Sequence, residues 1–342
     1  MKKLLALAMV GVALTSATFA GGNKDAKISP EHPLVLKMSH VFAPNEQLTK
    51  SLAIVCDNIK SRSKGAIEIQ QYPQSQLPVY KDGVEQVAQG AKFISVEDPS
   101  YIGDYVGNFN ALAGPMLVNN FDEYRWLTKS DLVAGMKKEL EDKHRIKVLS
   151  LDYIFGFRSM MTNKVITKPE DLKGMKIRTP GSKLYVETLN YMGATAVPMG
   201  FSETISAVQQ GVVDGLEGTV DAYASNGSAE VAKNMAFTNH LLGVCGVYIN
   251  ADLFNSIPKE YQTIIVEEFN KGADQMVSEV SNNYEATKKK LASTMGIKFN
   301  EVDHDAFAAR VAPVYENKDI MKGADPDILK RIRAEIAKMP KK

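Results

Sequence analysis

Residues 169–218 read PEDLKGMKIRTPGSKLYVETLNYMGATAVPMGFSETISAVQQGVVDGLEG and carry the clearest structural pattern in the chain. Short apolar segments typical of strands alternate with two segments typical of helices, and each helical segment follows a serine suited to an N-cap. The expected strands cover 176–178, 196–199 and 213–217, and the expected helices begin after Ser182 and Ser202. This alternation predicts an α/β fold with a parallel sheet and crossover helices.

Three side chains stand at or just past the ends of these expected strands: Arg178, Phe201 and Glu217. Ligands of parallel α/β sheets bind beyond the carboxyl ends of the strands. A guanidinium meets a carboxylate through two parallel hydrogen bonds and stays charged at every relevant pH. Arg178 is therefore a candidate anion-binding residue, and the alternative is an ordinary ion pair at the surface.

Three spaced motifs lie in the same stretch. They are P-x-D-L-K-G-x-K-I-R-x-P, M-G-A-x-x-x-P-M-x-F-S-E and Q-x-G-V-V-D-G-x-E, and they begin at residues 169, 192 and 209. In order and spacing this set resembles the solute receptors of TRAP transporters, and the resemblance continues into residues 237–240 and, more weakly, over nearly all of the chain beyond residue 20.

The resemblance implies a two-lobed periplasmic binding protein of the Venus-flytrap type, with mixed sheets, in which a bound ligand stabilises the closed form. It implies an organic acid anion as ligand and the membrane subunits of a TRAP permease as partners. It implies no enzymatic activity, cofactor or metal, and we expect a monomer.

The resemblance also places individual residues near the ligand. It puts an arginine at Arg158, a ligand contact at Glu97 or Asp98, and the loop of His40 near the cleft. Two alternatives remain from the residues themselves: His40 could satisfy groups of its own loop, and Asp98 could cap a helix that starts at the following proline.

Two further positions complete the candidate site. Tyr80 ends the loop at 76–80, and Gly218 departs from the family, in which many members carry asparagine after the glutamate of the D-G-x-E motif. The predicted ligand-binding residues are His40, Tyr80, Glu97, Asp98, Arg158, Arg178, Phe201, Glu217 and Gly218.

These residues suggest a mechanism and a class of ligand. Arg178 would bind the carboxylate, Arg158 would add a second positive centre, and Phe201 would pack on the carbon skeleton. Glu97, Asp98 and Glu217 would repel a second carboxylate but suit hydroxyl groups. A sugar acid, an aldonate or a uronate, is therefore favoured over a C4-dicarboxylate.

The N-terminus predicts export. Two lysines precede the apolar run Leu4–Leu14, and Thr18–Ala20 follows as a cleavage site, so residues 1–20 read as a signal peptide cleaved after Ala20. The apolar run is too short to span a membrane. We therefore expect a periplasmic protein.

The charge balance argues against nucleic acid as a partner. The chain has 41 Lys and Arg against 40 Asp and Glu, and no basic stripe of the kind that binds nucleic acid is present. An anion must then be captured by a local site and not by the field of the whole protein.

The rest of the chain predicts how the lobes are assembled. Lobe I is expected to comprise 21–155 plus 244–283, and lobe II 156–243 plus 284–342. The strand-like segments 153–157 and 241–249 would cross between the lobes as hinges. A helix from Pro258 to about Thr294 would lie along both lobes, and a single helix is expected from Asp122 to about Leu140.

Two alternatives remain for the function. An exported enzyme would need a nucleophile with a base or a metal, and the sequence has neither a G-x-S-x-G motif nor a zinc motif. A receptor for another transporter or a sensor kinase is the closer alternative.

Cys56 and Cys245 are expected as two buried free thiols, or else as a disulfide.

Overall fold

The computed structural model describes residues 27–340, so the predicted signal peptide and its cleavage site lie outside the described residues. The strands are β1 Leu34–Ser39, β2 Ile67–Tyr72, β3 Phe93–Glu97, β4 Ile146–Thr162, β5 Lys176–Thr179, β6 Thr195–Pro198, β7 Gly215–Gly218, β8 Asn234–Asn250 and β9 Lys298–Asn300. The helices are α1 Gln47–Arg62, α2 Tyr80–Ala88, α3 Asn108–Leu112, α4 Phe121–Thr128, α5 Asp131–His144, α6 Lys183–Met192, α7 Thr204–Gln209, α8 Val220–Ser225, α9 Ser228–Val231, α10 Ala251–Ser256, α11 Lys259–Met295, α12 His304–Val311 and α13 Ile328–Ile336, with 3-10 turns η1 Pro99–Tyr101, η2 Pro169–Leu172, η3 Phe201–Glu203 and η4 Ala312–Glu316.

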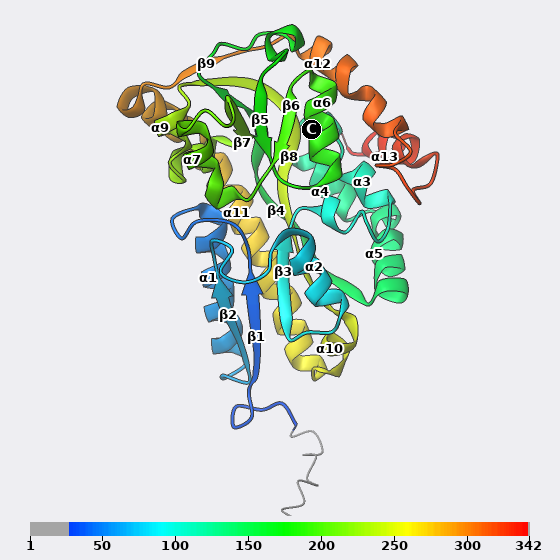
Figure 1. Ribbon diagram of the computed structural model, residues 1–342. Coiled ribbons are helices and arrows are strands. Elements are labelled where there is room, and N and C mark those ends of the chain that lie inside the picture. The colour runs from blue at the N-terminus through cyan, green and yellow to red at the C-terminus, as the bar shows by residue number, and fades with distance from the viewer. Residues whose placement is uncertain (1–26, 341–342) are drawn as a thin grey trace, which may run out of the picture.

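The strands form one mixed sheet in the order β2-β1-β3-β8-β4-β7-β5-β6, with β9 paired to β8. Its centre is the antiparallel pair β4 and β8, two strands of 17 residues each. One end of this pair joins the parallel strands β1–β3 through β3, and the other end joins β5–β7 through β7. Two lobes therefore share two continuous strands (Figure 1).

The predicted strand–helix–strand unit is confirmed. β5 pairs in parallel with β6 on one side and with β7 on the other, and α6 and α7 are the crossover helices. Ser182 stands at the N-cap of α6, but its side chain accepts no hydrogen bond from the helix. The segment after Gly200 begins as the 3-10 turn η3, so Glu203 and not Ser202 stands at the N-cap of α7.

Apolar side chains cover the sheet in each lobe, and α11 contributes to both lobes. Ile265 and Phe269 of α11 pack into the core beneath β1–β3, whereas Leu291 packs into a core of the other lobe. With 37 residues the helix is about 55 Å long at about 1.5 Å per residue. The prediction of a helix along both lobes is confirmed (Figure 1).

The expected single helix from 122 to 140 is wrong. Two helices, α4 and α5, are separated at Lys129 and Ser130. Ser130 has an extended backbone, donates its hydroxyl to Leu127 O and accepts from Val133 N. A serine that bonds the backbone on both sides in this way ends one helix and caps the next.

The C-terminal tail lies elsewhere than the sequence suggested. Ile328 and Ile332 of α13 pack into the core cluster formed by α2, α3, α4 and α5. The sequence placed this tail in lobe II, whereas α2–α5 belong to the predicted lobe I. The lobe boundaries as a whole remain a prediction. For the C-terminal helix α13, the observed packing differs from the predicted lobe assignment.

Two glycines face each other where the long strands cross between the lobes. Gly156 and Gly243 are partners in the ladder, and Gly156 has a φ of 121°. A Cβ on Gly243 would lie 2.8 Å from the carbonyl oxygen of Gly156 and 2.7 Å from the ring of Phe155. Only glycine fits this crossing, which lies in the segments predicted as hinges.

Cys56 and Cys245 are both buried free thiols, so the disulfide alternative is not formed. Burial raises the pKa of Cys56 to about 12, which keeps its thiol protonated. Among residues 27–340, no helix combines the length and the apolar character needed to cross a membrane.

Candidate functional site

A cavity lies where the two lobes meet. Six of the predicted ligand-binding residues line it: Tyr80, Arg158, Arg178, Phe201, Glu217 and Gly218. The first lobe contributes Tyr80 and apolar side chains such as Phe42, and the second lobe contributes Arg178 and Phe201. A ligand here would touch both lobes at once.

Arg178 is a buried cation at this cavity. Only 1% of its surface is exposed. Its Nε and Nη2 donate to the carbonyl oxygen of Met199, at 3.2 and 2.8 Å, and its guanidinium carbon lies 5.2 Å from the ring centre of Phe201. Among residues 27–340, Arg178 forms no ion pair with a carboxylate. A buried charge in this state needs a counter-ion.

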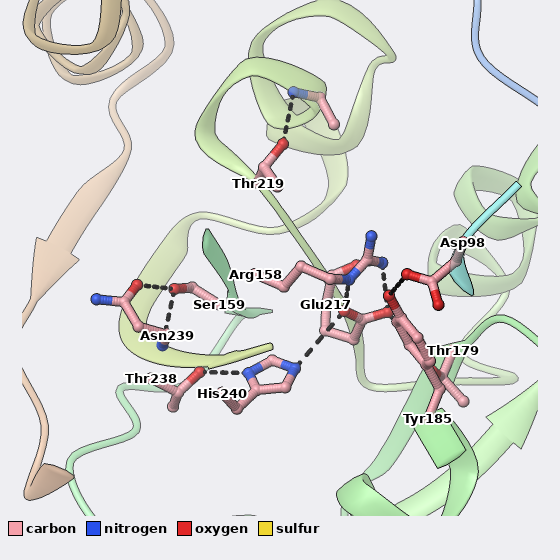
Figure 2. Close-up of polar contacts among 11 residues, drawn as sticks. Asp98, Arg158, Ser159, Thr179, Tyr185, Glu217, Thr219, Thr238, Asn239 and His240 are labelled. Atoms are coloured by element: carbon pink, nitrogen blue, oxygen red, sulfur yellow. Dashed lines mark hydrogen bonds and ion pairs between the residues drawn. The ribbon is translucent and has the colours of Figure 1, made fainter. Parts of the chain in front are cut away.

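Arg158, in contrast, already has its counter-charge. Its Nε and Nη2 donate to the two carboxylate oxygens of Glu217 at 2.5 and 2.6 Å (Figure 2). The pairing of β4 with β7 puts Met160 opposite Glu217, so neighbouring strands hold both partners. The side chain of Arg158 is 11% exposed and that of Glu217 is fully buried. The sequence predicted Arg158 and Glu217 as separate ligand contacts, whereas the structure joins them.

His240 supports Glu217 from the side away from Arg158 (Figure 2). Its Nε2 lies 3.6 Å from a carboxylate oxygen of Glu217, and its Nδ1 bonds the hydroxyl of Thr238 at 2.8 Å. Burial lowers the pKa of His240, so the ring is neutral. Burial would raise the pKa of Glu217, but the charge of Arg158, its two hydrogen bonds to the carboxylate and the nearby His240 ring bring that pKa well below its usual range. Glu217 therefore stays ionised.

Asp98 lies behind Arg158 and does not line the cavity. It accepts hydrogen bonds from Ser100 N at 2.8 Å and from the hydroxyl of Tyr185 at 2.7 Å, and the guanidinium of Arg158 lies 5.1 Å from the ring centre of Tyr185. Asp98 thus caps η1, which was one of the two alternatives for it. Its bond with Tyr185 of α6 also joins the lobes.

Glu97 positions Tyr80 and does not itself line the cavity. Its carboxyl oxygen accepts from Tyr80 N at 2.7 Å, and Tyr80 has a left-handed backbone with a φ of 57°. Burial raises the pKa of Glu97 to about 8, so it is mostly protonated at neutral pH. The Tyr80 hydroxyl in turn accepts from Phe201 N at 3.2 Å and from Arg178 Nη2 at 3.4 Å.

His40 is fully buried away from the cavity. Its Nε2 bonds the side-chain amide of Gln71 at 2.8 Å, and burial lowers its pKa to about 4. The ring thus does not line the cavity, although the loop after it does through Val41 and Phe42, and its partner Gln71 belongs to β2 and not to its own loop. Gly218 does line the cavity, and a Cβ there would lie 3.3 Å from the flexible end of Met161.

The sequence reasoning did not single out several residues at this site. Phe42, Phe155, Asn226 and Ser228 line the cavity, whereas Tyr185 and His240 support the Arg158–Glu217 pair from behind. Only His240 had a signal, because the family resemblance continues through residues 237–240 without giving that histidine a role. Within residues 27–340, no group of His, Cys, Asp and Glu side chains is arranged to hold a metal ion.

Comparisons with known proteins agree that this chain is similar to bacterial solute-binding proteins. The family model described as bacterial extracellular solute-binding protein, family 7, matches residues 38–320. A TRAP periplasmic solute-binding protein from Desulfovibrio salexigens, solved in complex with diglycerolphosphate, is 54% identical with a TM-score of 0.87 over 90% of this chain and 97% of that chain.

Two further solved structures carry other ligands. A TRAP periplasmic solute-binding protein from Fusobacterium nucleatum, with bound sn-glycerol-3-phosphate, is 40% identical with a TM-score of 0.86 over 89% of this chain and 97% of that chain. One from Actinobacillus succinogenes, with bound L-galactonate, is 28% identical with a TM-score of 0.83 over 89% of this chain and all of that chain.

Proposed function

Because the chain belongs to family 7 of the bacterial extracellular solute-binding proteins, the periplasmic receptors of TRAP transporters, we propose that it captures a small hydroxylated anion between its lobes and delivers it to a TRAP permease. Proteins of this family bind solutes for transport and are not enzymes. Cleavage of a signal peptide after Ala20 and a monomeric state remain predictions.

Arg178 is the observation that carries this proposal. It is a buried guanidinium at the cavity, and among the described residues no carboxylate neutralises it. Its Nη1 has no hydrogen-bond partner within residues 27–340, so it is free to donate to a ligand oxygen. Carboxylates and phosphates both accept charge-assisted hydrogen bonds from arginine. An anionic ligand would supply the counter-charge that the protein lacks.

The first ligand class that we propose is the phosphate esters of glycerol. Two solved relatives, 54% and 40% identical to this chain, hold diglycerolphosphate and sn-glycerol-3-phosphate. The cavity offers one unpaired cation, few polar groups such as Asn226 and Ser228, and an apolar wall that includes Phe42 and Phe155. A charged head on a short hydroxylated chain suits this lining.

Sugar acids are the second class, as the sequence predicted. The relative with L-galactonate supports them at 28% identity. The original reason for preferring them has weakened, because Glu97 lies outside the cavity lining and Glu217 is paired with Arg158. Binding of the carboxylate by Arg178 is unaffected by this change and remains part of the proposal.

A thermal-shift screen of the exported form tests the proposed function. The panel contains diglycerolphosphate, sn-glycerol 3-phosphate, aldonates, uronates and C4-dicarboxylates, with glycerol as the uncharged control. A ligand at 1,000 times its Kd stabilises the folded state by about 4.1 kcal/mol, so a true ligand raises Tm by several degrees. We expect the largest shift from a glycerol phosphate ester and none from glycerol. If no anion in the panel moves Tm, the proposal is wrong.

Tyr80→Phe should weaken binding of the best ligand from that screen about three- to tenfold. The substitution removes the hydroxyl that accepts from Phe201 N and Arg178 Nη2 across the lobes, and each such bond contributes about 0.5–1.5 kcal/mol. Calorimetric titration measures the change. Tyr72→Phe, which removes a hydroxyl bonded only to Gln70 among the described residues, is the matched control and should bind normally. An unchanged Kd for Tyr80→Phe would rule out this role for the hydroxyl.

A further inference from the structure

We infer that Glu217 determines which ligand charge the site prefers. Because of Glu217, the site binds singly charged anions more tightly than doubly charged anions with the same carbon skeleton. The inference rests on the proposed function and deepens it. Of the side chains that line the cavity, Arg158, Arg178 and Glu217 carry the formal charges. Glu217 neutralises Arg158, which leaves one positive charge, that of Arg178, for a ligand to balance.

The pairing of Arg158 with Glu217 is built into the fold. Both donors on one edge of the guanidinium are used by the two carboxylate oxygens, at 2.5 and 2.6 Å. Adjacent strands hold the partners, and Glu217 also lies 3.5 Å from the hydroxyl of Thr179 and 3.6 Å from His240. Separating the pair would leave a fully buried carboxylate without a counter-charge. A ligand therefore meets Arg158 as half of a neutral pair.

Among the described residues that line the cavity or contact its charged side chains, no other group adds positive charge. His240 is neutral because burial lowers its pKa, and burial raises the pKa of the Tyr80 and Tyr185 hydroxyls, so both stay protonated. Glu97 and Asp98 lie behind the lining. If either carboxyl ionises, it makes the region less positive, which disfavours a second negative charge on the ligand still further.

A second charge on the ligand would thus lose its water without gaining a partner. It would also lie in the same cavity as the ionised Glu217. A phosphate diester such as diglycerolphosphate carries one charge, whereas a monoester such as sn-glycerol 3-phosphate gains its second charge at about pH 6. The two ligands share the phosphate and glycerol chemistry, so a comparison of their binding isolates the effect of charge.

Calorimetric titration of the wild-type protein from pH 5 to pH 7.5 tests the inference. If the singly charged form is the one that binds, the apparent Kd of the monoester rises as that form becomes scarce, to about thirtyfold at pH 7.5. The diester keeps its single charge over this range, so its Kd reports any titration of the protein itself. We expect the ratio of monoester Kd to diester Kd to rise at least about tenfold.

Glu217→Gln should reverse this preference. The glutamine has nearly the same shape but frees the charge of Arg158, so the cavity lining carries two positive charges. The monoester should then bind at least about tenfold better relative to the diester at pH 7.5 than in the wild type. Glu170→Gln, which removes an exposed carboxylate paired with Arg310, is the matched control and should leave the ratio unchanged.

The inference is overturned if the Kd of the monoester stays constant or falls from pH 5 to pH 7.5 while the Kd of the diester stays constant. The proposal that the site binds an anion would survive that result. If only sugar acids bind, gluconate and glucarate replace the phosphate pair: gluconate should bind at least about tenfold more tightly, and equal binding overturns the inference. If no anion of the thermal-shift panel binds, the proposed function fails and the inference with it. Because the wild-type series needs no variant, a misfolded Glu217→Gln would not remove the test.

Discussion

Arg178→Lys is expected to weaken binding of the transported anion at least about tenfold, and Arg178→Met about a hundredfold or more. Arginine binds a carboxylate or phosphate through charge-assisted hydrogen bonds worth about 1.5–3 kcal/mol each. Lysine keeps the charge but cannot reproduce the planar geometry, and methionine removes the one cation of the described cavity lining that has no carboxylate partner. Calorimetric titration with the ligand from the thermal-shift screen measures both losses.

The stability of these variants without ligand separates binding from folding. Arg178 forms no ion pair within residues 27–340, so its replacement leaves no carboxylate without a partner. The main interactions lost are the two hydrogen bonds to Met199 O. Tm without ligand should therefore change little compared with the ligand-induced rise in Tm, which should disappear in Arg178→Met. Arg310→Met, at an exposed ion pair, should bind normally. A Kd for Arg178→Lys within threefold of the wild type would contradict the proposed role of the guanidinium.

Arg158→Met is expected to lower the free energy of unfolding by about 3–5 kcal/mol. Removing one partner of a buried ion pair leaves the other as an uncompensated charge, and the side chain of Glu217 has no solvent exposure. A typical protein of this kind is stable by about 5–15 kcal/mol in total, so the loss is a large share of it. Urea titration without ligand measures the change.

The pH dependence of this loss identifies Glu217 as its cause. In the wild type the pKa of Glu217 is depressed, so its stabilising effect is present above its ordinary pKa of about 4.3 and is lost as the pH falls below it. Without Arg158, burial raises that pKa and protonation relieves the cost. The difference in free energy of unfolding between Arg158→Met and the wild type should thus be largest near pH 7 and become smaller towards pH 4.

Arg310→Met again serves as the control. It breaks an ion pair whose side chains are 54% and 60% exposed, and such pairs contribute about 0–1 kcal/mol. An equal loss of stability in the two variants, or a loss for Arg158→Met that does not depend on pH, would show that the charge of Glu217 is not the cause.

The sequence predicted the positions of the site better than its contacts. Arg178, Phe201 and Glu217 could be placed at one edge of a sheet because alternating strands and helices define a parallel unit, and the ends of parallel strands meet. The long helix could be predicted from its apolar period. Both inferences use patterns within a few tens of residues, which the chain carries locally.

The partners of the side chains could not be predicted because they depend on strand register. Arg158 and Glu217 are 59 residues apart in the chain, and nothing in the local pattern fixes which residue of β4 faces which residue of β7. Glu97 gives a second example. Its position after a strand suggested a ligand contact, but its carboxyl binds the backbone of Tyr80. The break at Ser130 was missed because the prediction rested on acidic residues at the start of the segment and basic residues at its end, which do not locate a break between them.

The two strands shared by the lobes also constrain the order in which the protein can be completed. In the lobe that contains β1–β3, β8 lies between β3 and β4, yet it is synthesised last of the three. Until residue 250 has emerged, β3 and β4 each present an unpaired edge, and such edges associate readily with other chains. The first half of the protein can therefore close only after the chain from the end of β4 at Thr162 to the end of β8 at Asn250 has followed it.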